Sequence, residues 1–118
     1  MAITIETKYP DALLQAIKEA IKAGKVTAWE IYNHENVEYL TQATGPLKKK
    51  AYLKAVVATN ENKLKFGFYG AGKPVNRSVY ADYHGRFIQL LLEKFEDKFV
   101  YASAGSKALS IDKFTLEP

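Results

Sequence analysis

Alternating apolar residues in the middle of the chain predict a β-hairpin. Every second residue from Ala51 to Val57 is apolar, and the alternation returns from Leu64 to Phe68. The Asn-Glu-Asn run between these stretches favours a turn. A turn at positions 60 and 61 pairs Leu53 with Phe68 and keeps the apolar side chains on one face. The same register places Tyr52 opposite Tyr69 on the other face.

Apolar residues at helical spacing predict two helices. The first runs from Ala12 to Ala23, with Pro10 and Asp11 at its start. The second runs from Ser78, a candidate N-cap, to Asp97. Both need a sheet to cover their apolar sides. The expected core residues are Leu13, Ile17, Phe66, Phe68, Phe87 and Leu91.

Further strands are expected on both sides of the hairpin. Segments 26–32 and 37–43 predict two strands, and 98–102 predicts another after the second helix. Both faces of the first two are partly apolar, which favours a central position or coverage on two sides. Residues 3–7 suit a short strand or an extended arm, and 111–116 a strand or a loose tail.

The order of these elements, α-β-β-β-β-α-β, predicts one α+β domain over residues 1–118. Strands joined by short turns form an antiparallel meander, with both helices on one face of the sheet.

The composition excludes several kinds of chemistry and several classes of protein. The chain has no cysteine, which excludes disulfides, thiol nucleophiles and thiolate metal sites. Its start lacks the apolar core of a secretory signal, and no stretch approaches the ~18 apolar residues of a membrane span. We therefore expect a soluble cytoplasmic protein without membrane contact.

Candidate catalytic motifs are weak. The run Gly70-Ala71-Gly72-Lys73 resembles part of a phosphate-binding loop, but Pro74 stands where Ser or Thr is required. His34 and His84 are far apart and lack metal-ligand spacing. We expect His84 to be structural, and the protein to be non-catalytic, without cofactor or metal.

Charge is concentrated in the middle of the chain. Residues 45–77 contain seven lysines, one arginine and a single acid, a net charge of +7, while the whole chain carries +4. Lysines interleaved with tyrosines suit nucleic acid, since ammonium groups pair with phosphates and tyrosines stack on bases. The expected ligand-binding residues are Lys48, Lys49, Lys50, Tyr52, Lys54, Lys63, Lys65, Tyr69, Lys73 and Arg77.

This basic face is also compatible with roles that involve no nucleic acid. The lysines could simply keep an exposed sheet face soluble and protect its edge. The same surface also suits a protein-protein interaction module, such as an inhibitor, immunity or assembly protein that binds an acidic partner. A homodimer could bury Tyr52 and Tyr69 in its own interface.

Overall fold

The computed structural model describes residues 2–70, 72–106, 109 and 111–114. The helices are α1 (Pro10–Lys22) and α2 (Arg77–Lys94), and two 3-10 turns are η1 (Thr59–Glu61) and η2 (Glu96–Lys98). The strands are β1 (Ile3–Glu6), β2 (Trp29–His34), β3 (Val37–Gln42), β4 (Ala51–Ala58), β5 (Lys63–Gly70) and β6 (Tyr101–Ala104).

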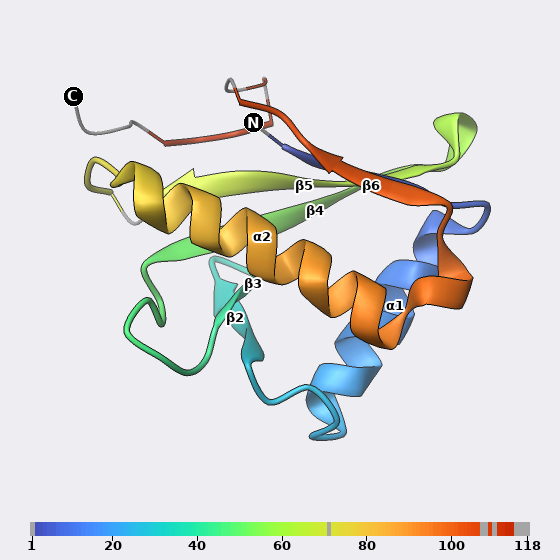
Figure 1. Ribbon diagram of the computed structural model, residues 1–118, viewed down its shortest axis with the longest axis horizontal. Coiled ribbons are helices and arrows are strands. Elements are labelled where there is room, and N and C mark those ends of the chain that lie inside the picture. The colour runs from blue at the N-terminus through green and yellow to red at the C-terminus, as the bar shows by residue number, and fades with distance from the viewer. Residues whose placement is uncertain (1, 71, 107–108, 110, 115–118) are drawn as a thin grey trace.

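The strands form one antiparallel sheet in the order β2-β3-β4-β5-β1-β6, with both helices on one face (Figure 1). The predicted α+β class, the order of the elements and the meander from β2 to β5 are confirmed. The N-terminal stretch is a true strand. It lies between β5 and β6, a position that its sequence does not reveal.

The predicted hairpin register is confirmed. Leu53 is aligned with Phe68, and Tyr52 with Tyr69. The turn is a 3-10 turn closed by Asn62, whose φ of 55° is a left-handed conformation that asparagine tolerates well. Because side chains alternate along a strand, this register fixes which residues face the helices and which face away.

The core lies between the helices and the sheet. All six predicted core residues are at most 1% exposed. Trp29 joins them from β2 and meets Tyr83 and Phe87 edge to face, at ring-centroid distances of 5.7 and 5.3 Å. Such aromatic pairs stabilise beyond their buried area. They hold α2 against the start of β2.

Several predicted boundaries are wrong. The N-cap of α2 is Asn76, whose side chain accepts a hydrogen bond from the Ser78 amide at 2.6 Å. The helix ends at Lys94, and the last strand occupies 101–104 rather than 98–102 because η2 takes up part of the interval. Residues 111–114 run beside β5 through one parallel bridge, between Tyr69 and Lys113. The rest of the candidate strand 111–116 lies outside the described residues.

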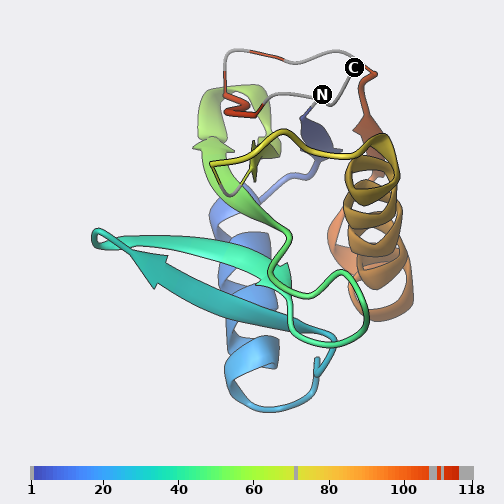
Figure 2. The ribbon, with the colours of Figure 1, turned by 90° about the vertical axis from the view of Figure 1, so that its left-hand side faces the viewer.

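Of the two alternatives expected for these strands, a central position or coverage on two sides, the central position holds for β3 but not for β2, which is an edge strand. The β2–β3 hairpin extends away from the rest of the sheet (Figure 2). A single aligned pair, Leu40 with Leu53, joins it to β4. The second apolar face of the β2–β3 hairpin is formed by tyrosines that lie on the outer side of the sheet.

Candidate binding site on the outer face of the sheet

Four tyrosines form a continuous row on the face that points away from the helices. This tyrosine row consists of Tyr32, Tyr39, Tyr52 and Tyr69, from four neighbouring strands. The ring of Tyr52 lies 4.9 Å from that of Tyr32 and 6.1 Å from that of Tyr39. Tyr39 also meets Tyr69, at 5.4 Å. These contacts help to fasten the β2–β3 hairpin to the sheet.

The tyrosine row lines a shallow hollow of about 330 Å³. His34 extends the row at the tip of the hairpin, where its ring stacks on Tyr32 at 6.2 Å. Gly70 and Gly72 complete the wall. The φ of +81° at Gly72 favours glycine there. Tyr32 is 37% exposed and the other three rings are half-buried. Aromatic surface is therefore open to a ligand.

The phenol of Tyr52 stays neutral well beyond physiological pH. Burial raises its pKa above the ordinary value, and the neighbouring Tyr32 adds to the effect. A neutral ring does not repel a phosphate, and its hydroxyl remains able to donate a hydrogen bond. The row can therefore combine stacking with hydrogen bonding to a polar, anionic ligand.

The outer face also carries lysines, but acids neutralise part of their charge. Lys54 lies over the ring of Tyr69, with its Nζ atom 6.0 Å from the centroid. Strand alternation places Lys63 and Lys65 on the same face. Lys65 pairs with Glu61, with Nζ and carboxylate oxygen 3.6 Å apart. The face is thus less basic than the count of lysines suggests.

The remaining predicted site residues lie on two loops and at the start of α2, and not all of them reach this face. Lys48, Lys49 and Lys50 are exposed on the loop between β3 and β4, and Lys49 lies 3.6 Å from Glu30. Lys73 is exposed next to Gly72, at the rim of the hollow. Arg77 begins α2 and belongs to the helix layer on the other side of the sheet.

Sequence reasoning missed half of the tyrosine row. Tyr32 and Tyr39 share a face of the β2–β3 hairpin, and this common face is readable from their spacing. Their meeting with Tyr52 depends on how β3 pairs with β4, where one aligned pair sets the register. A single pair leaves no repeating hydrophobic pattern to follow.

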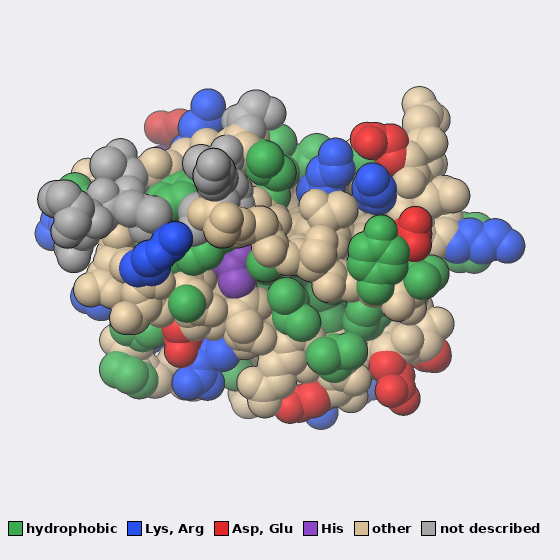
Figure 3. All heavy atoms as spheres, turned by 45° about the horizontal axis from the view of Figure 1, so that its top comes forward, with side chains coloured by type: hydrophobic (Ala, Val, Ile, Leu, Met, Phe, Trp, Pro, Cys, Tyr) green, Lys and Arg blue, Asp and Glu red, His purple; other side chains and the backbone are tan. Residues whose placement is uncertain are grey.

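The side with the helices has a different surface. Over α2 and β6, basic and acidic side chains are interspersed with hydrophobic ones (Figure 3). The exposed hydrophobic residues include Leu92, Val100 and Tyr101. A surface of mixed sign lacks the electrostatic footprint of a nucleic-acid site. The outer face is therefore the stronger candidate.

His84 lies in the core of the helix layer, and its predicted position near the apolar face of α2 is confirmed. It is 3% exposed, its Nδ1 atom is 2.7 Å from the carbonyl oxygen of Tyr80, and its ring packs on Phe68 and Tyr80. Within the described residues, no three His, Asp or Glu side chains gather closely enough to hold a metal ion. Nor is any helix in that part long and apolar enough to cross a membrane.

Comparison with protein-family models, curated proteins and solved structures gave no match. The outer face supplies aromatic surface, hydroxyl groups and lysines.

Proposed function

We propose that the protein is a non-catalytic binding protein that takes up single-stranded nucleic acid on the outer face of its sheet. The tyrosine row is the observation that carries the proposal. Its four rings are in contact across neighbouring strands, and the hollow that they line is open to solvent. The absence of cysteine agrees with action in the cytoplasm, which is part of the proposal.

Single strands suit this surface better than duplexes. Their bases are free to stack on aromatic rings exposed on an antiparallel sheet, as in other sheet-based readers of RNA. Each stacked base contributes about 1–3 kcal/mol and requires no particular sequence. Lys54 lies over the ring of Tyr69 and Lys73 follows Gly72, so both are placed beside the hollow to meet phosphates. Lys63 lies on the same face at the other end of β5, where it can meet a phosphate farther along the strand.

The first test is electrostatic. Fluorescence anisotropy with labelled single- and double-stranded oligonucleotides at low salt measures affinity. If about four phosphates are neutralised, log K should fall against log salt with a slope near −3 for a single strand. Replacing Lys63 and Lys65 with Glu should weaken binding similarly for all sequences, because phosphate contacts carry little sequence information. The matched control replaces Lys22 and Lys98, exposed in the helix layer, in the same way.

The second test addresses stacking. Tyr52→Ala or Tyr69→Ala should weaken single-strand binding by about 1–3 kcal/mol, and duplex binding less. Tyr52→Phe keeps the ring and should retain most of the affinity. Tyr9→Ala removes an exposed ring, 64% accessible, just before α1, and serves as the control. A thermal melt of each variant separates lost binding from lost folding.

The outcomes distinguish nucleic acid from an acidic protein and from a second copy of the chain. Equal losses in the two lysine pairs would show that net charge alone drives binding and would refute the proposed face. No binding at tens of micromolar protein would favour the alternative, an interaction module for an acidic protein. Concentration-dependent burial of the tyrosine row in the free protein would instead indicate a homodimer.

A further inference from the structure

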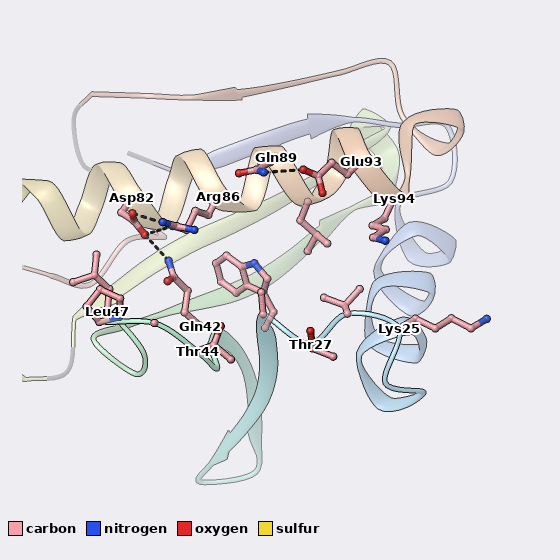
Figure 4. Close-up of a pocket in the computed structure, with 16 residues that line it drawn as sticks. Lys25, Thr27, Gln42, Thr44, Leu47, Asp82, Arg86, Gln89, Glu93 and Lys94 are labelled. Carbon is pink, nitrogen blue, oxygen red and sulfur yellow. Dashed lines mark hydrogen bonds and ion pairs between the residues drawn. The ribbon is translucent and has the colours of Figure 1, made fainter.

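A second cleft lies on the helix side of the sheet, remote from the tyrosine row. It has a volume of about 340 Å³ and opens between α2 and the loop that follows β3 (Figure 4). Asp82, Arg86 and Lys94 line it from α2, while Gln42 and Leu47 line it from the opposite side. Lys25 also borders it but points away from it (Figure 4). Its size is at the lower end of small-molecule sites.

The floor of the cleft contains a side-chain donor that is open to solvent. Trp29 is only 4% exposed, and within the described residues its indole N–H makes no hydrogen bond. No fully buried side-chain nitrogen or oxygen there lacks a partner, so this N–H must reach solvent, and the cleft is the surface that Trp29 lines. An indole nitrogen can only donate. It therefore calls for an acceptor on a ligand or a water.

The acids of the cleft already have partners, whereas its bases retain free donors. Asp82 accepts from Gln42 at 2.8 Å and from the Nε atom of Arg86 at 2.9 and 3.0 Å. Glu93 accepts from Gln89 at 2.7 Å. In the described part of the chain, the terminal amino groups of Arg86 and the ammonium group of Lys94 have no such partner. The free donors are thus mostly positively charged, while the carboxylate of Glu93, whose partner is a neutral amide, keeps its negative charge.

We propose that this cleft binds a small organic anion, with a carboxylate or phosphate group on an aromatic or apolar body. The anionic group meets Arg86, whose guanidinium fork matches both anions in two-point geometry, and Lys94 adds positive charge farther along the cleft (Figure 4). The body packs against Leu47 and the nearly buried Leu90, and an acceptor on it takes the proton of the Trp29 indole. The site is independent of nucleic-acid binding on the outer face.

The test uses the single tryptophan of the chain. Its indole N–H gives one resonance in a ¹H–¹⁵N spectrum, which reports directly on the floor of the cleft. Phenyl phosphate and phenylacetate are titrated separately, to distinguish the two anionic groups, and benzyl alcohol serves as the neutral probe. We expect a saturable shift of the indole resonance with at least one of the two anions, and none with the alcohol.

Variants then assign the contacts. Arg86→Gln should weaken binding about tenfold or more, as expected for loss of a charged hydrogen bond, and Lys94→Gln should weaken it less, because Lys94 contributes charge from farther along the cleft. Lys22→Gln removes the same charge outside the cleft and should leave affinity unchanged. Arg86 has a 60% exposed side chain, so its replacement is not expected to unfold the protein. Three results would each overturn the proposal. They are an equal shift for all three probes, equal affinity in the three variants, and no saturable shift at millimolar anion.

Discussion

Gly67 permits the C-terminal segment to lie against β5, and replacing it should release that segment. A Cβ atom at this position would come closer to the carbonyl oxygen of Ile111 than the 3.0 Å that real Cβ contacts respect. The clashing atoms belong to the backbone of Ile111, so they cannot move aside by a change of side-chain rotamer. In Gly67→Ala, residues 111–114 must therefore leave the edge of β5.

The expected cost follows from the bonds that hold the segment. The amide of Lys113 donates to the Phe68 carbonyl, and that of Gly70 to the Lys113 carbonyl, both at 2.9 Å. The Phe68 amide also donates to the carboxylate of Asp112 at 2.7 Å. At about 0.5–1.5 kcal/mol for each neutral bond and 1.5–3 for the charged one, their loss totals roughly 2.5–6 kcal/mol. Replacing a strand glycine returns up to about 1 kcal/mol.

Hydrogen exchange and urea unfolding measure this loss. The amides of Phe68 and Gly70 should exchange much faster in Gly67→Ala, and the free energy of unfolding should fall by about 2–5 kcal/mol. Gly85→Ala is the matched control, because nothing lies within 4 Å of an added Cβ there. In the interior of α2 it should stabilise the protein by up to about 1 kcal/mol. Unchanged protection of Phe68 in Gly67→Ala would refute the reasoning.

Three other substitutions probe the core and its hydrogen bonds. Phe87→Ala removes a fully buried ring that packs on Phe66 at 4.7 Å, and should cost about 3–5 kcal/mol in a urea melt. Tyr83→Phe leaves the Leu47 carbonyl and Lys50 amide without the hydroxyl that bonds both, at 2.6 and 3.1 Å, and should cost about 1–3 kcal/mol by the same measurement. Burial raises the pKa of Tyr80 to about 12. The neutral hydroxyl of Tyr80 therefore contributes its full stabilisation below about pH 10, and this contribution is lost as the pH rises toward 12. Wild-type protein should therefore lose up to about 2–3 kcal/mol more than Tyr80→Phe over that interval, in urea melts at each pH.

Local patterns predicted the central hairpin because two of its properties agree. The alternation in β4 and β5 and the turn-forming asparagines both require the register that aligns Leu53 with Phe68. The two helices were predicted in the same way, from apolar residues that recur at helical spacing. The insertion of β1 between β5 and β6 could not be predicted, because it depends on long-range pairing in which Ile3 meets both Phe66 and Ala104.

The candidate site was only partly accessible from the sequence, for a related reason. Tyr52 and Tyr69 face each other across a regular ladder, so their pairing is encoded locally. The acids that neutralise the lysines, in contrast, are not encoded by the local sequence. Glu61 reaches Lys65 around the turn, and Glu30 reaches Lys49 from a different strand. Counting charges along the chain overestimates the positive potential of a face whenever such acids fold back onto it.

The loop between β3 and β4 borders the cleft. Thr44 and Leu47 line the cleft beside α2, while Lys49 extends toward Glu30 on β2, with 3.6 Å between its Nζ atom and the carboxylate. Tyr83 anchors this loop at the Leu47 carbonyl and the Lys50 amide. Two ligands can influence each other only if one changes the state that the other binds, and any such coupling is reciprocal. Because the anchor is fully buried and bonds both ends of the turn, it holds the loop in the arrangement described. We therefore expect an anion in the cleft to leave the affinity for oligonucleotides unchanged when the two are titrated together.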